Sequence, residues 1–192
     1  MAKIKMCGMT NLDDCRAAID LGVDFIGFVF YKESRRYVTP ERVREITEKI
    51  NRMTKTVGVF VEENDREIDR LMDFCHLDFA QTYGKHTRDN RISVYRINDS
   101  VPAVDPVGLV LFDSYSTGFG GSARSFDIGL LKGHSSLPRA FIAGGIGEHN
   151  VYAALSLDPF GVDLVSSVEK EKGMKDHVKM ERLVKMVRSH AI

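Results

Sequence analysis

The chain has 192 residues, of which 43% are hydrophobic and 28% charged, and its 27 basic side chains balance 27 acidic ones. A balanced charge provides no positive field of the kind that drives nonspecific binding to a phosphate backbone, so we expect no nucleic-acid partner. The length and composition are typical of one globular domain spanning residues 1–192, and they exclude two ordinary domains or a disordered chain.

Hydropathy and cysteine content indicate the compartment. No apolar run approaches the roughly 20 residues that a membrane-spanning helix needs. The N-terminus alternates charged and apolar residues, unlike a signal peptide. Cys7, Cys15 and Cys75 have no paired spacing, which argues against a disulfide framework and a structural zinc site. We therefore expect a cytoplasmic protein with reduced thiols and neither a metal nor a membrane partner.

Short runs rich in Val, Ile and Phe alternate along the chain with amphipathic segments. The expected strands are 4–7, 25–30, 56–61, 79–81, 93–97, 108–112, 139–143 and 162–165. The expected helices are 11–21, 39–50, 64–74, 148–155 and 176–188. Helix starts are marked by Thr10-Asn11, by Thr39 before Pro40, and by Asn64 or Asp65, because these residue types cap or open a first turn.

Alternation of strand and helix predicts a parallel α/β sheet, and eight strands predict a single closed (β/α)8 TIM barrel. An open doubly wound sheet is the alternative. The spacers 82–92 and 98–107 are too short and polar for full crossover helices. We therefore expect helices between strands 4 and 6 to be shortened or missing.

Ligands of parallel barrels bind at the carboxyl ends of the strands, so the residues that follow the apolar runs are site candidates. Two glycines follow the seventh strand and two serines follow the eighth, where many barrels bind phosphate through backbone N–H groups. A tight turn is the plainer interpretation of the glycine pair. No G-x-G-x-x-G spacing occurs there, so no dinucleotide cofactor is expected. The substrate-binding candidates are Arg36, Gln81, Asp113, Gly144, Gly145, Ser166 and Ser167.

Three side chains, Cys7, Asp113 and Asp127, are suited to acid–base chemistry. Cys7 ends the first strand and is either a base, which requires the thiolate, or a buried structural cysteine. Asp113 and Asp127 flank the glycine-rich segment 118–121, which we interpret as a lid, and either carboxyl is a candidate acid. Asp127 is also placed to cap a helical turn. Arg35 and Arg36 both suit a carboxylate, although a surface charge is the more usual role of such arginines.

Distinctive short motifs follow one another along nearly the whole chain. In its earlier part they are KMCGMT at 5–10, GFVF at 27–30, SRRYV at 34–38 and VGVFV at 57–61. In its later part they are GGS at 120–122 with FD at 126–127, AGG at 143–145, GVD at 161–163, VE at 168–169 and GMKD at 173–176. In order and spacing, this set resembles the phosphoribosylanthranilate isomerase family of tryptophan biosynthesis.

The resemblance implies a (β/α)8 barrel that converts N-(5'-phosphoribosyl)anthranilate to 1-(2-carboxyphenylamino)-1-deoxyribulose 5-phosphate by an Amadori rearrangement, without metal or cofactor. It also implies roles. Asp127 would be the general acid that protonates the furanose oxygen, and Cys7 the general base that takes the proton from sugar C2. Arg36 would hold the anthranilate carboxylate. The phosphate would bind around Gly144, Gly145, Ser166 and Ser167.

Three motifs depart from the family pattern. Tyr83 stands in QTYG where the family usually has Gln-Leu-His-Gly, Ala123 stands in ARS where it has Gly-Lys-Thr, and Ser167 replaces a glycine. Two alternatives follow. One is a weakly active or inactive barrel that binds a phosphorylated ligand. The other is the aminoaldose isomerase of histidine biosynthesis, which usually has aspartate where Cys7 stands. The expected partner is a small phosphorylated substrate, and the expected assembly is a monomer or homodimer.

Overall fold

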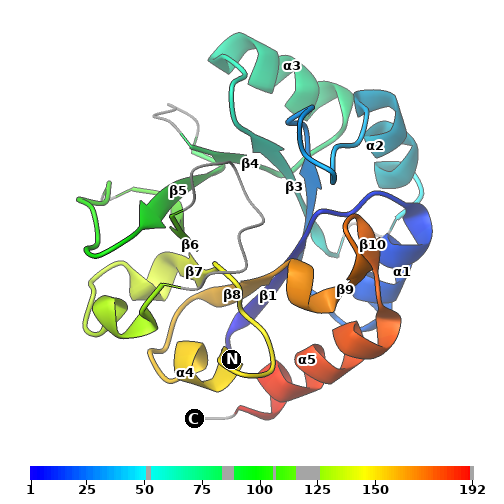
Figure 1. Cartoon of the computed structure of the whole chain (residues 1–192). Coiled ribbons are helices and arrows are strands. Elements are labelled where there is room, and N and C mark those ends of the chain that lie inside the picture. Colours follow the sequence, from blue (N-terminus) through cyan, green and yellow to red (C-terminus); the bar gives the residue numbers. More distant parts are fainter. Residues whose placement is uncertain (51–52, 84–88, 106, 116–125, 191–192) are drawn as a thin grey trace.

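Eight parallel strands close into a barrel in sequence order, with β8 paired to β1 (Figure 1). The computed structural model describes residues 1–50, 53–83, 89–105, 107–115 and 126–190. The closed barrel confirms the predicted TIM barrel, so the open-sheet alternative is wrong. The strands are β1 (Lys3–Cys7), β2 (Phe25–Val29), β3 (Lys55–Phe60), β4 (Phe79–Thr82), β5 (Arg91–Ile97), β6 (Leu109–Ser114), β7 (Ala140–Ile142) and β8 (Gly161–Leu164).

Four of the five α-helices begin within one residue of their predicted starts, and the helix expected at 148–155 begins three residues later, at Val151. Asn11, Thr39 and Asn64 each accept a hydrogen bond from the backbone N–H three residues ahead, which satisfies one of the free donors of a first helical turn. Pro40 follows Thr39 at the first helical position, where its missing N–H costs nothing. The α-helices are α1 (Leu12–Asp20), α2 (Pro40–Thr47), α3 (Asp65–Phe74), α4 (Val151–Leu155) and α5 (His177–Ser189).

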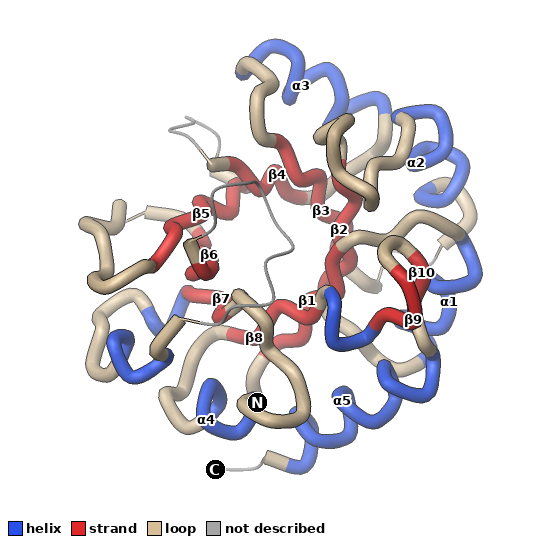
Figure 2. The backbone as a smooth tube through the Cα atoms, viewed as in Figure 1, coloured by secondary structure: helices blue, strands red, loops and turns tan. Residues whose placement is uncertain are grey.

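The wall around β5 and β6 has few helices, as Figure 2 shows. Among the described residues, no α-helix lies between β4 and β6, and only the 3-10 helices η1 (Ile128–Leu131) and η2 (Leu137–Arg139) lie between β6 and β7. Side-chain hydrogen bonds hold the loops there instead. Arg139 donates to the backbone oxygens of Gly108 and Asp105. The predicted thin wall is therefore confirmed.

Side chains alternate along each strand between the barrel interior and the helix layer. Near the amino-terminal ends the interior is aromatic: the ring of Phe25 contacts those of Phe79 and Phe141 edge-on, with centroids 5.6 and 5.2 Å apart. Toward the carboxyl ends the inward residues become polar, and they include Cys7, Gln81, Asp113 and Asp163. Apolar side chains therefore close the amino-terminal end of the barrel interior. Polar side chains line its carboxyl end, where ligands of such barrels bind.

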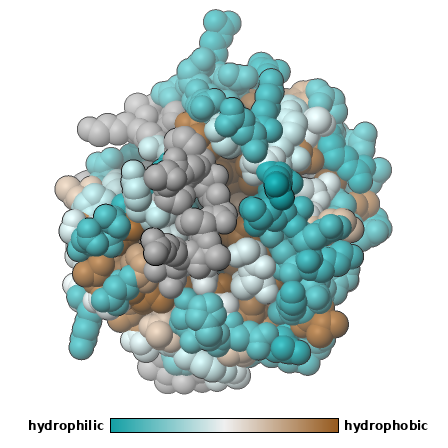
Figure 3. All heavy atoms as spheres, viewed as in Figure 1, coloured by the Kyte–Doolittle hydropathy of each residue, from teal (hydrophilic) through white to brown (hydrophobic). Residues whose placement is uncertain are grey.

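The outward-facing residues of the strands form the main core with the helices. Ile4 and Met6 of β1 and Leu183 of α5 are fully buried members of it. Polar residues cover most of the face shown in Figure 3. No described helix is long and apolar enough to cross a membrane.

A short hairpin follows β8. The 3-10 helix η3 (Ser166–Val168) leads into β9 (Glu169–Glu171), which pairs antiparallel with β10 (Met174–Lys175). The sequence pattern does not predict this hairpin, because its strands are two and three residues long and mostly polar. The hairpin lies beside the carboxyl ends of the barrel strands (Figure 1).

Candidate active site

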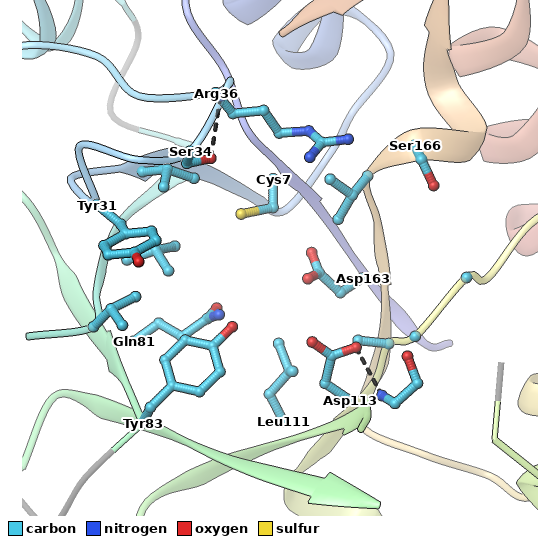
Figure 4. Close-up of a pocket in the computed structure, with 18 residues that line it drawn as sticks. Cys7, Tyr31, Ser34, Arg36, Gln81, Tyr83, Leu111, Asp113, Asp163 and Ser166 are labelled. Atoms are coloured by element: carbon cyan, nitrogen blue, oxygen red, sulfur yellow. Dashed lines mark hydrogen bonds between the residues drawn. The ribbon is translucent and has the colours of Figure 1, made fainter. Parts of the chain in front are cut away.

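A pocket opens at the carboxyl ends of the barrel strands (Figure 4). Its free volume is about 860 Å³, part of it open to solvent. Seven of the nine predicted site residues line it. They are Cys7, Arg36, Gln81, Asp113, Gly144, Gly145 and Ser166.

The Cys7 side chain occupies a space that a neighbouring glycine leaves free. Cys7 pairs in register with Gly27 of β2, and a Cβ at Gly27 would lie 2.7 Å from the Cys7 sulfur. That separation is well below van der Waals contact, so an alanine there would displace the thiol. Cys7 is 6% exposed, and burial raises the pKa of its thiol.

A buried ion pair lies next to the thiol. Lys5 and Asp163 are register partners on β1 and β8, and the Lys5 Nζ lies 2.9 Å from an Asp163 carboxylate oxygen. Burial acts to lower the pKa of Lys5, but attraction to Asp163 and Cys7 outweighs it and leaves that pKa raised. Lys5 is therefore an ammonium, and it opposes the effect of burial on the Cys7 pKa.

Arg36 reaches the pocket from the loop after β2. Its backbone N–H donates to the Ser34 hydroxyl at 3.1 Å. Its guanidinium donates from Nε and Nη2 to the two carboxylate oxygens of Glu169, at 2.8 and 2.7 Å. Arg36 and Glu169 are both 7% exposed, so the predicted carboxylate-binding arginine is an ordered, largely buried group.

The glycine pair after β7 takes a conformation that suits only glycine. Gly144 and Gly145 have φ of 79° and 82°, in the left-handed region that L side chains rarely adopt. A Cβ at Gly144 would also lie 2.7 Å from the backbone nitrogen of Ser114. The backbone of the β7 end can therefore approach the β6 end closely, and both line the pocket.

The two serines after β8 differ in position. Ser166 lines the pocket, whereas Ser167 is not among the described lining residues. The Ser167 hydroxyl is buried and has no hydrogen-bond partner in the described part of the chain. A Cβ at Gly147 would lie 3.2 Å from the Ser167 Cβ. Ser167 therefore packs beside Gly147, in the segment that follows Gly144 and Gly145.

Asp127 lies outside the described pocket lining. It is exposed, and its carboxylate accepts a hydrogen bond from the Gly129 backbone N–H at 2.9 Å, which caps η1. The preceding residue, Phe126, is buried in the main core and anchors the Phe126-Asp127 dipeptide there. The predicted lid, 118–121, and Ala123 lie outside the described residues, as does Gly84 of the QTYG motif.

Comparisons with known proteins identify the family. The sequence model of N-(5'-phosphoribosyl)anthranilate (PRA) isomerase matches residues 4–186. The chain belongs to the PRA isomerase family. It is 38% identical to the PRA isomerase of Magnetococcus marinus, over 97% of this chain and 95% of the relative. The predicted family is confirmed, and the activity is isomerisation of N-(5'-phosphoribosyl)anthranilate in tryptophan biosynthesis.

Solved PRA isomerases have the same fold. The Thermus thermophilus enzyme superposes with a TM-score of 0.87 at 29% identity, covering 98% of this chain and all of that one. A second PRA isomerase, solved with reduced 1-(o-carboxyphenylamino)-1-deoxyribulose 5-phosphate, has a TM-score of 0.80 at 26% identity with the same coverage. The confirmed family favours neither the histidine-pathway isomerase nor an inactive barrel.

Tyr83, at the family's usual histidine position, lines the pocket. The Arg96 guanidinium lies over its ring, 5.0 Å from the ring centre. Burial raises the pKa of the Tyr83 hydroxyl, so this residue stays neutral at physiological pH. The departure from the family pattern therefore replaces a titratable imidazole with a neutral phenol.

Sequence reasoning assigned no role to Lys5, Asp163, Glu169 or Lys175. A signal existed for the first two: a lysine two residues before Cys7 shares its face of the strand, and an aspartate interrupts the last apolar run. Glu169 and Lys175 belong to family motifs, but their contacts with the site depend on the unpredicted hairpin.

Asp113 is a pocket carboxyl whose charge costs stability. Burial, followed by repulsion from Asp163, raises its pKa to about 6. A carboxyl with a raised folded-state pKa binds protons more tightly when folded, so stability falls as pH rises from about 4 to 6. Asp113→Asn, which keeps the oxygen that accepts from the Ser114 N–H, should raise the free energy of unfolding by about 2–3 kcal/mol above pH 7.

Urea unfolding of both proteins at about pH 7.5 and pH 4 checks this expectation. The gain should be much smaller at about pH 4, where the carboxyl is protonated in the folded wild type and about half protonated in the unfolded chain. The exposed Asp20→Asn variant is the control and should show no such pH-dependent gain. Equal stability of Asp113→Asn and wild type at the higher pH would contradict the expectation.

Proposed function

We propose that this chain rearranges N-(5'-phosphoribosyl)anthranilate with Cys7 as the general base and Asp127 as the general acid. The observation that carries the proposal is the buried Cys7 thiol, which lines the same pocket as Arg36 and lies beside the Lys5 ammonium. A base and a carboxylate-binding cation in one pocket suit a substrate that carries both an acidic sugar C–H and a benzoate. The family membership supplies the substrate.

The first step opens the sugar ring. Asp127, as the carboxylic acid, donates its proton to the furanose oxygen while the lone pair of the anthranilate nitrogen forms a C1=N bond and the C1–O bond breaks. The products are an open-chain iminium and the Asp127 carboxylate. Asp127 follows the buried Phe126 in the segment between β6 and η1, and the family resemblance of this Phe-Asp pair supports the role.

The second step moves the proton from C2. The Cys7 thiolate takes the proton, the C2–H electron pair forms a C1=C2 bond, and the C1=N electrons return to nitrogen, which gives an enolamine. The enolamine loses its C2 hydroxyl proton and gains one at C1, so the product is the ketone. The carbon skeleton is oxidised at C2 and reduced at C1, so the rearrangement needs no external electron acceptor.

Substrate binding in this proposal divides among the strand ends. Arg36 holds the anthranilate carboxylate, and Gln81 and Asp113 face the sugar. The Gln81 amide oxygen is buried without a hydrogen-bond partner among the described residues, which suits it to accept from a substrate hydroxyl. The phosphate lies against the strand ends after β7 and β8, at Gly144, Gly145, Ser166 and Ser167.

The proposal extends to the whole chain. One domain spanning 1–192 is supported by the pairing of β1 with β8, which joins the two ends of the chain in one barrel.

For the assembly, a homodimer and a monomer are both compatible with the proposed function. Monomers generated from the dimeric Thermotoga maritima isomerase superpose with a TM-score of 0.81 at 26% identity, covering 98% of this chain and all of that one. The unpaired cysteines favour a cytoplasmic location.

A substrate-choice experiment tests the proposed function. Purified protein is incubated separately with N-(5'-phosphoribosyl)anthranilate and with the aminoaldose substrate of the histidine-pathway isomerase, and both products are quantified by chromatography. We expect conversion of the anthranilate substrate alone. Conversion of the histidine-pathway substrate at a similar kcat/KM would contradict the assignment, and binding of either substrate without conversion would support the inactive-barrel alternative.

A further inference from the structure

We propose that Glu169 is a positioning residue that holds the Arg36 guanidinium so that its Nη1 edge faces the substrate carboxylate. The inference rests on the proposed carboxylate-binding role of Arg36. Glu169 is not among the described residues that line the pocket, so it would act on the substrate only through Arg36.

The geometry of the pair divides the guanidinium into two edges. Glu169 accepts from Nε and Nη2 through both carboxylate oxygens, which fixes the plane as well as the position of the group. In the described part of the chain, the hydrogen bonds of this guanidinium use only those two nitrogens. Nη1, on the other side, is available to a ligand, and Figure 4 shows the Arg36 side chain extending across the pocket above Cys7.

The backbone at Gly8 allows this placement. Gly8 has φ of 78°, and a Cβ there would lie 2.5 Å from Arg36 Cδ. The arginine side chain therefore lies directly against the backbone that follows Cys7. Glu169 determines the direction of the guanidinium, and Gly8 provides the space for its stem.

The hairpin in turn fixes Glu169. The Lys175 ammonium donates to a Glu169 carboxylate oxygen at 3.2 Å and to the backbone oxygens of Cys7 and Val165 at 2.6 and 3.3 Å. Three acceptors match the three donors of an ammonium. The Gly173 N–H also donates to Glu169, at 3.3 Å. Glu169 is thus held from β10 and from the hairpin turn.

Charge also favours an anion at this position. Burial lowers the pKa of Lys175, but its Nζ has three oxygen acceptors, one of them a Glu169 carboxylate oxygen, which is the pattern of an ammonium. Arg36, Glu169 and Lys175 then form a buried cluster of two cations and one anion, with one net positive charge. A substrate carboxylate on Nη1 would balance that charge in a site of low dielectric, where the pairing is stronger than in water. Removing the Glu169 charge frees the guanidinium to turn away and removes the partner that orients it.

The test compares two substrates that differ only in the group Arg36 binds. One is N-(5'-phosphoribosyl)anthranilate, and the other is the N-phosphoribosyl derivative of aniline, which lacks the carboxylate. KM and kcat are measured for wild type, Glu169→Gln, Arg36→Met and the double variant. Glu171→Gln is the matched control, since Glu171 is exposed on the same hairpin.

For Glu169→Gln we expect KM for the anthranilate substrate to rise about ten- to a hundredfold with kcat changed less than about threefold. Both constants for the aniline substrate should stay at wild-type values. Adding Glu169→Gln to Arg36→Met should cost nothing more. Glu169→Asp keeps the charge and should recover part of the lost preference for the carboxylate substrate.

Two results would overturn the inference. A wild-type preference for the carboxylate substrate in Glu169→Gln would show that Glu169 does not orient Arg36. An equal loss for both substrates, in Glu169→Gln and Glu169→Asp alike, would show a merely structural role. A wild-type preference in Arg36→Met is a different failure, because it would refute the proposed role of Arg36 itself.

Discussion

Cys7→Ala is expected to lower kcat by about 10²–10⁴-fold, the usual loss when a general acid–base group is removed. The proton on sugar C2 would have no thiolate to accept it. The fold should persist, because the removed sulfur faces the pocket and the outward residues of β1 remain packed in the core. Steady-state kinetics measures the loss of kcat, and circular dichroism measures whether the fold persists.

A second thiol provides the control for Cys7. Cys15 is fully buried on α1, outside the described pocket lining, and Cys15→Ala should retain turnover despite the loss of some packing. Wild-type turnover in Cys7→Ala would contradict the assigned base. The pH dependence of kcat gives a further test. Because burial raises the Cys7 pKa and only the thiolate is a base, kcat should increase with pH.

Asp127→Asn should lower kcat by a similar factor, about 10²–10⁴-fold. This substitution separates the two roles of the residue. Asparagine caps a helix about as well as aspartate, so the hydrogen bond from the Gly129 N–H should persist. It has no acidic proton, so it cannot protonate the furanose oxygen. Unchanged thermal stability with lost turnover is the expected combination, measured by a melting curve and kcat.

The alternative acid is Asp113, which lines the pocket and has a pKa of about 6. Asp113→Asn, assayed beside Asp127→Asn, decides between the two carboxyls. Full turnover in Asp127→Asn together with lost turnover in Asp113→Asn would transfer the acid role to Asp113. The exposed Asp20→Asn variant controls for the charge change in both comparisons.

Most of the barrel could be predicted because its signals are local. Each strand is an apolar run, and each of the first three helices starts at a capping side chain. Predicted and observed strand ends differ by at most two residues, since buried parallel strands are bounded by polar turns. The short polar spacers around β5 likewise show in the sequence that no full helix fits there.

The site was predictable only in part, for a different reason. Cys7 and Arg36 come directly from strand ends and motifs, but their supporting partners are distant in the chain. Lys5 meets Asp163 only because β8 closes onto β1, and Arg36 meets Glu169 across 133 residues. Barrel closure and the hairpin after η3 create these contacts, and no local periodicity encodes either one.

Single-turnover decay of anthranilate fluorescence tests the central claim most directly. Enzyme in excess over freshly generated N-(5'-phosphoribosyl)anthranilate isolates the chemical steps from product release, with wild type, Cys7→Ala and Asp127→Asn run under identical conditions. The account predicts fast decay for wild type and decay slower by about 10²-fold or more for each variant. Wild-type protein that binds the substrate without decay, or variants that decay at the wild-type rate, would contradict it.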